Sequence, residues 1–198
     1  MLTLCQEQFD GALRYWLYLV KTVLGVWMIW VVRRWVPEMR WSFSLEAAIV
    51  GVFVFVLWVG LDPWYPKLGK AGSPWNPHLT FGQGSLIAWA FVTVRILGST
   101  FVVPLIEEVF YRSFFYRQII KAEFQSVPLS RLSPFAFLGT SILFGVSHYE
   151  WLAGILCGLA YQGLVCWKNR LGDAITAHAI TNLLLGCWVV WKEAWHFW

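Results

Sequence analysis

The stretch PLIEEVFYRSFFYR, Pro104 to Arg117, places two adjacent carboxylates and two guanidinium groups inside an otherwise apolar part of the chain. The chain of 198 residues is 59% hydrophobic and only 13% charged, whereas soluble domains carry about 25% charged residues. An ionisable side chain at membrane depth costs at least about 2.5 kcal/mol on insertion scales and usually marks a functional position. The stretch therefore indicates a polar site inside a membrane protein.

Apolar runs on both sides of this stretch predict membrane helices, because a spanning helix needs about 20 mostly apolar residues. The expected helices cover residues 13–32, 43–61, 86–99, 104–122, 135–147, 151–167 and 174–191. We therefore predict an all-α fold, a polytopic transmembrane helical bundle with about 6–8 crossings.

A turn near residues 98–103 is part of this prediction. Pro104 suits the first turn of a new helix, where its missing N–H has no cost. A single crossing over residues 86–122 would instead leave Glu107 and His148 at opposite membrane faces. We therefore prefer seven crossings, with Pro104 opening a separate helix.

The whole chain, residues 1–198, is expected to form one membrane domain with two parts. Residues 1–85 would supply N-terminal helices and a Pro/Gly-rich interfacial loop at residues 62–85, and residues 86–191 would form the core that holds the polar site. The net charge of +4 comes without a clustered basic face, which argues against nucleic acid as a partner. We expect membrane lipids as partners and a multi-pass location in a bacterial inner membrane.

Helical spacing separates the charges of the opening stretch. Glu108 and Arg112 are four residues apart, so they share a helix face and can pair. Glu107 is rotated from Glu108 by about 100°, which leaves it free to take a proton from water. Arg117 is expected at the membrane interface.

Two further polar groups end or begin apolar runs: His148 in FGVSH and His178 with Asn182 in HAITN. Taken together with the glutamates, they could activate water and stabilise a tetrahedral intermediate, which is the chemistry of peptide hydrolysis. Taken singly, each has a structural reading: an ion pair for Glu108–Arg112, a packed core or interfacial histidine for His148, and helix-joining hydrogen bonds for His178 and Asn182.

The order EExxxR, FxxxH and HxxxN resembles the CPBP intramembrane proteases, the family of the CAAX prenyl endopeptidases and bacteriocin-processing proteins. Glu107-Glu108-Val-Phe-Tyr-Arg112, Phe144-Gly-Val-Ser-His148 and His178-Ala-Ile-Thr-Asn182 match its three motifs. The resemblance implies an intramembrane endopeptidase with the following roles for these residues: Glu107 as general base with His148 as its partner, His178 and Asn182 as the oxyanion site, and Glu108 with Arg112 as the orienting pair.

The resemblance also frames the substrate and the cofactor. It implies a protein or lipidated-peptide substrate, and the short chain with its Trp-rich loop is similar to the exosortase-associated CAAX protease-related group. The sequence lacks HExxH, so we expect a metal-free hydrolase. A Zn²⁺ ion held by Glu107, His148 and His178 is the alternative.

Two other functions fit the same polar residues. A non-catalytic relative could use the pocket to bind a peptide or to confer bacteriocin immunity. A small transporter could line a polar path with these side chains.

Overall fold

The computed structural model describes residues 11–68 and 73–198, and within those ranges every regular element is helical. Residues 69–72 of the predicted interfacial loop lie outside the described residues. The α-helices are α2 (Leu13–Val32), α3 (Leu45–Leu61), α4 (Pro77–Phe81), α5 (Leu86–Leu97), α6 (Val103–Glu108), α7 (Tyr116–Ile120), α8 (Pro134–Val146), α9 (Trp151–Lys168) and α10 (Gly172–Lys192). The predicted all-α helical bundle is confirmed.

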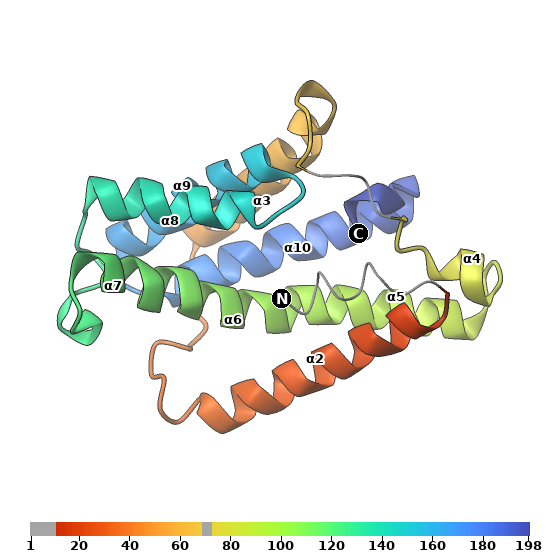
Figure 1. Ribbon diagram of the computed structural model, residues 1–198, viewed down its shortest axis with the longest axis horizontal. Helices are drawn as coiled ribbons and strands as arrows, with labels where there is room; N and C mark the ends of the chain where they lie inside the picture. The colour runs from red at the N-terminus through yellow and green to blue at the C-terminus, as the bar shows by residue number, and fades with distance from the viewer. Residues whose placement is uncertain (1–10, 69–72) are drawn as a thin grey trace.

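Helices α5, α6 and α7 are parts of one continuous helix, Leu86–Ile120, of 35 residues (Figure 1). Two π-helical segments, η2 (Gly98–Val102) and η3 (Val109–Phe115), join the three parts. The predicted turn near residues 98–103 is therefore wrong, and so is the preference for seven crossings that rested on it. Pro104 is accommodated inside the helix by the wider π-helical turn that precedes it, where the Val103 N–H bonds to the Gly98 carbonyl.

Four helices of the described chain are long and apolar enough to cross a membrane: Leu13–Val32, Leu45–Trp64, Leu86–Ile120 and Gly172–Lys192. Helix α10 is the most enclosed of them, with 50% of its apolar window buried against 17% for α2 and for α3. It runs through the middle of the bundle, between the long helix and the helices α3, α8 and α9 (Figure 1). These features are those of an integral membrane protein, with α10 as its central helix.

Helices α8 and α9 form a closely packed antiparallel pair that turns at His148 (Figure 1). Gly154 and Gly158 lie one turn apart on the face of α9 that meets α8. A Cβ atom at Gly158 would lie 2.9 Å from the Cα of Ser141, and one at Gly154 would lie 2.9 Å from the Cα of Gly145. Small residues at this spacing let membrane helices approach closely, which fixes the position of the turn between them.

Arg117 lies near the C-terminal end of the long helix and is buried within the protein. It is 4% exposed, its Nη2 lies 2.9 Å from Glu38 Oε1, and its Nη1 donates to the Val127 carbonyl. A buried guanidinium requires a charged partner, so this ion pair fastens the segment between α2 and α3 to α7.

Arg95 of α5 is surrounded by aromatic rings. Its guanidinium carbon lies 5.0 Å from the ring centre of Tyr18, 4.6 Å from that of Trp75 and 5.2 Å from that of Trp198. Cation–π contacts of this kind stabilise a charge in an apolar setting, so the cation is part of the packing between α2, α5 and the C-terminal segment.

Candidate functional site

The centre of the site is Glu108, whose side chain is fully buried and carries two ionic contacts. Its Oε1 lies 2.8 Å from His178 Nδ1, and its Oε2 lies 3.2 Å from Arg112 Nε. The pairing of Glu108 with Arg112 expected from their spacing is present, and His178 joins it from α10, 70 residues further along the chain. One carboxylate therefore connects the first and the third motif.

Arg112 lies in η3 and is 1% exposed. Its guanidinium carbon is 4.2 Å from the ring centre of Phe144 and 5.7 Å from that of Tyr161. Nη1 and Nη2 are buried and have no hydrogen-bond partner among the described residues. The cation is thus stabilised by one carboxylate and by the faces of aromatic rings, and removal of the carboxylate would leave it unpaired.

His178 is oriented by Glu108 and by Tyr161, which is itself held by hydrogen bonds. Its ring stacks on Tyr161, with 5.3 Å between ring centres and 30° between planes, and its Nδ1 contacts Glu108. The Tyr161 hydroxyl donates to Thr181 Oγ1 at 2.7 Å, and Thr181 in turn donates to the Gly51 carbonyl of α3 at 2.8 Å. Because Nδ1 is engaged by Glu108, Nε2 is the ring nitrogen left for other chemistry.

Glu107 differs from its neighbour in the way that the helical period predicts. It is part-exposed, whereas Glu108 is buried. Its Oε2 is buried and has no hydrogen-bond partner in the part of the chain that the structure describes, and its charge interacts with the ammonium of Lys21 on α2. A carboxylate oxygen without a partner is available to accept a hydrogen bond from water or substrate.

His148 lies at the end of α8, level with η3. Its Nδ1 is 2.7 Å from the Phe144 carbonyl, and its ring centre is 4.6 Å from that of Phe144. The Tyr111 hydroxyl of η3 donates to Ser147 Oγ at 3.2 Å. The 35-residue helix would be about 52 Å long at 1.5 Å per residue, and the first motif lies about two-thirds of the way along it, where the short α8 returns.

Phe144 is the residue that brings the three motifs together. Its ring contacts Arg112 and His148, and its centre lies 6.2 Å from that of His178. Within residues 11–68 and 73–198, no hydrogen bond or ion pair joins Glu107 to His148. Direct contacts therefore unite Glu108, Arg112 and His178, while His148 approaches them through Phe144.

Asn182 lies one turn beyond His178 on α10, and its Nδ2 donates to the Ser99 carbonyl at 2.8 Å. In the i to i+5 pattern of a π-helix, that carbonyl would accept from residue 104, and Pro104 has no N–H. Asn182 thus replaces the missing backbone donor. An amide nitrogen carries two hydrogens, so one remains for a ligand.

This replacement predicts coupling between two positions. Asn182→Ala is expected to cost roughly 1–3 kcal/mol of stability, because the Ser99 carbonyl loses its donor. Pro104→Ala restores an N–H at the required position, so it should stabilise the Asn182→Ala protein by at least about 0.5 kcal/mol more than it stabilises the wild type. Thermal unfolding of the two single variants and the double variant in micelles measures this; equal effects of Pro104→Ala in both backgrounds would contradict it.

The three residues considered for Zn²⁺ do not form a metal-binding group. Among the described residues, no three His, Cys, Asp or Glu side chains converge in a way that could hold a metal ion. The His178 Nδ1 is already bonded to Glu108, and Glu107 and His148 are not joined. The donor set as placed does not fit a Zn²⁺ site.

The fold and the site define a class: a helical membrane protein with a buried Glu–Arg–His cluster, in which the long helix supplies Glu108 and Arg112 and α10 supplies His178. Comparison with protein families gives a match between residues 89–184 and the family described as type II CAAX prenyl endopeptidase Rce1-like. The matched segment contains all three motifs, and the match supports placing the chain among these CAAX proteases. Comparisons with curated proteins and with solved structures gave no match.

Sequence reasoning missed several residues that shape the site. Phe144 is part of the second motif, but nothing in the sequence indicates that its ring contacts Arg112. Tyr161 is one aromatic residue in an apolar helix and could not be singled out.

Proposed function

We propose that the protein is an intramembrane endopeptidase of a bacterial inner membrane, cutting a protein substrate near its membrane-associated end. The observation that carries the proposal is the different environment of two adjacent glutamates. Glu108 is buried between Arg112 and His178, whereas Glu107 keeps a buried oxygen without a partner. Adjacent carboxylates in separate environments suit separate roles in acid–base chemistry, and the family is one of proteases.

In the proposed reaction, Glu107 removes a proton from a water molecule that His148 helps to orient. The water oxygen forms a bond to the carbonyl carbon of the scissile peptide, and the carbonyl oxygen takes the displaced electron pair. Glu107 then returns the proton to the amide nitrogen as the C–N bond breaks, giving a new carboxyl group and a new amine. General acid–base catalysis of this kind contributes about 10²–10⁴-fold to a rate.

His178 and Asn182 are the proposed donors to the oxyanion. The contact between His178 Nδ1 and Glu108 leaves Nε2 to face the substrate, and this role requires a proton on Nε2. Asn182 uses one amide hydrogen on the Ser99 carbonyl and retains the other. Donors placed where charge develops stabilise the transition state strongly in a site that excludes water.

The substrate class follows from the location of the site. The residues of the first motif lie about two-thirds of the way along a helix long enough to cross a bilayer, so a substrate has to present its peptide bond from within or beside the membrane. A protein with a lipidated or apolar terminal segment satisfies this requirement, whereas a freely soluble peptide does not.

The experiment is a cleavage assay with purified protein in proteoliposomes. A panel of lipidated and unlipidated membrane peptides is added, and the products are identified by mass spectrometry. We expect one defined cut near the membrane-associated end. Tight binding without any product would favour the non-catalytic relative, and ion or solute flux without a product would favour the transporter.

A further inference from the structure

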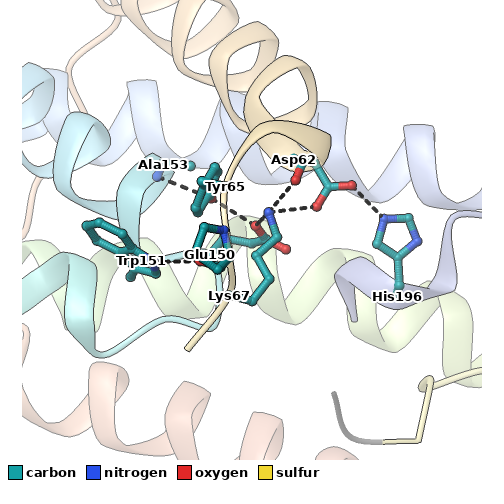
Figure 2. A network of polar contacts seen from close by, with 8 residues as sticks. Asp62, Tyr65, Lys67, Glu150, Trp151, Ala153 and His196 are labelled. Carbon is teal, nitrogen blue, oxygen red and sulfur yellow. Dashed lines mark hydrogen bonds and ion pairs between the residues drawn. The ribbon is translucent and has the colours of Figure 1, made fainter. Parts of the chain in front are cut away.

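A short segment from the N-terminal part of the chain crosses the turn that follows His148 (Figure 2). We call Tyr65–Leu68 the strap. It contacts two residues of the turn and two in the first turn of α9. The Leu68 N–H donates to the Tyr149 carbonyl, and Lys67 and Tyr65 bind Glu150. The Pro66 carbonyl accepts from Trp151 Nε1 at 2.9 Å, and the Tyr65 hydroxyl accepts from the Ala153 N–H. The strap therefore contacts both residues that lie between His148 and the start of α9, Tyr149 and Glu150.

Lys67 is the strongest of these connections. Its ammonium lies 2.7 Å from Glu150 Oε2 and 3.1 Å from Asp62 Oδ1, and it donates to the Asp62 carbonyl at 2.6 Å. All three ammonium hydrogens thus have acceptors. Glu150 is 5% exposed and its other oxygen has no hydrogen-bond partner, so Lys67 is the cation that makes its burial possible.

Tyr65 adds a second hydrogen bond to the same carboxylate, 2.9 Å from its hydroxyl to Glu150 Oε2. Burial raises the pKa of Tyr65 to about 12, and the hydrogen bond to Glu150 adds to the effect. Burial opposes the charge of Lys67, but its hydrogen bonds to Glu150 and Asp62 raise its pKa overall. Both groups therefore keep their protons at neutral pH, so both can donate to Glu150.

The same end of α3 also supports the His148 ring. Trp58 packs edge-on against that ring, with 5.7 Å between ring centres and 82° between planes. Trp58 lies one helical turn before Asp62, which binds Lys67. The imidazole and the backbone that follows it are thus both located by one continuous segment, residues 58–68.

We propose that Lys67 and Tyr65 are positioning residues for His148, acting through Glu150. This inference rests on the proposed function, in which His148 orients the attacking water. It gives a role to a part of the chain outside the residues 89–184 that the family comparison matches. The strap sets where the imidazole lies relative to the helix that carries Glu107, and a displacement of about 1 Å at such a group can lower a rate by about 10²-fold.

The kinetic test uses Lys67→Met and Tyr65→Phe, with Lys67→Arg as the conservative variant and Lys121→Met as the matched control. Lys121 is 56% exposed, and its nearest carboxylate oxygen, on Glu123, is 3.7 Å away. We expect kcat to fall about 10–100-fold in Lys67→Met, with KM unchanged because the strap does not touch the substrate. We expect a smaller fall in kcat for Tyr65→Phe than for Lys67→Met. Lys67→Arg should keep most of the wild-type kcat, and the kcat of Lys121→Met should equal that of the wild type.

A second test does not depend on cleavage. Diethyl pyrocarbonate modifies accessible imidazoles, and peptide mapping reports each histidine separately. We expect the rate at His148 to rise at least about 3-fold in Lys67→Met, because the turn opens more often without its ion pair, while the rate at His178 stays constant. If His148 is modified at the same rate in Lys67→Met and in the wild type, or if kcat is unchanged in Lys67→Met, the inference is overturned. A wild type that cleaves nothing, with a raised His148 rate in Lys67→Met, would instead sink the proposed function and leave the positioning intact.

Discussion

Glu108→Ala is expected to lower the free energy of unfolding by about 3–5 kcal/mol, because it leaves a buried charge without its partner. Arg112 is 1% exposed and its nearest anionic atom is Glu108 Oε2. The same substitution removes the acceptor for His178 Nδ1. The first and the third motif therefore lose the carboxylate that joins them. Unfolding in mixed micelles, followed by tryptophan fluorescence, measures the change.

A double variant separates the charge effect from the packing effect. Glu108→Leu with Arg112→Met removes both charges and keeps the volume, so it should be much more stable than Glu108→Ala. Glu123→Ala is the control for a lost carboxylate, since that side chain is 74% exposed, and it should change stability by less than about 0.5 kcal/mol. Equal stability of Glu108→Ala and wild type would show that Arg112 does not depend on this carboxylate.

Glu107→Gln is expected to lower turnover by about 10²–10⁴-fold while leaving the unfolding midpoint unchanged. The substitution keeps the size of the side chain and removes its ability to take a proton. Its effect on folding should be too small to move the midpoint, because the carboxylate Oε2 has no hydrogen bond to lose among the described residues and only the interaction of its charge with Lys21 is removed. Steady-state cleavage in proteoliposomes and thermal unfolding of the same preparation provide the two measurements.

The adjacent glutamate supplies the contrast. Glu108→Gln keeps an oxygen for His178 but weakens the pairing with Arg112, so it should lose stability as well as turnover. Full activity in Glu107→Gln, in a preparation where the wild type cleaves, would remove Glu107 from the role of base.

The sequence predicted the class of the fold and the pairing within the first motif because both depend on local patterns. Apolar runs of membrane length predict helices, and a spacing of four residues predicts a shared face. The separation of Glu107 from Glu108 follows from the same period. These predictions needed no knowledge of how the helices pack.

The position of Pro104 shows where local patterns stop being sufficient. Proline at a helix start and proline inside a helix look alike in sequence, since both follow an apolar run. Here the helix widens into a π-helical segment at Gly98–Val102. The Ser99 carbonyl accepts its hydrogen bond from Asn182, which lies 83 residues later in the sequence on another helix. A contact over that distance in sequence cannot be seen in the run that contains Pro104.

The aromatic and ionic support of the site was equally hidden. Phe144 and Tyr161 are two of many aromatic residues in apolar helices, and only the packing of α8 and α9 brings them to Arg112 and His178. Glu150 joins Lys67 through a contact between two separate connecting segments. Such contacts depend on which helices are neighbours, and the sequence did not specify that.

A single-turnover cleavage in ¹⁸O-labelled water is the most direct test of the central claim that Glu107 activates water at this site. Direct attack by water places one ¹⁸O atom in the new carboxyl group of the product and leaves the Glu107 carboxylate unlabelled, and this is the result we predict. A first-turnover product that contains only ¹⁶O, with the label in the peptide that carries Glu107, would show that the carboxylate itself attacks the substrate. That outcome would contradict the account.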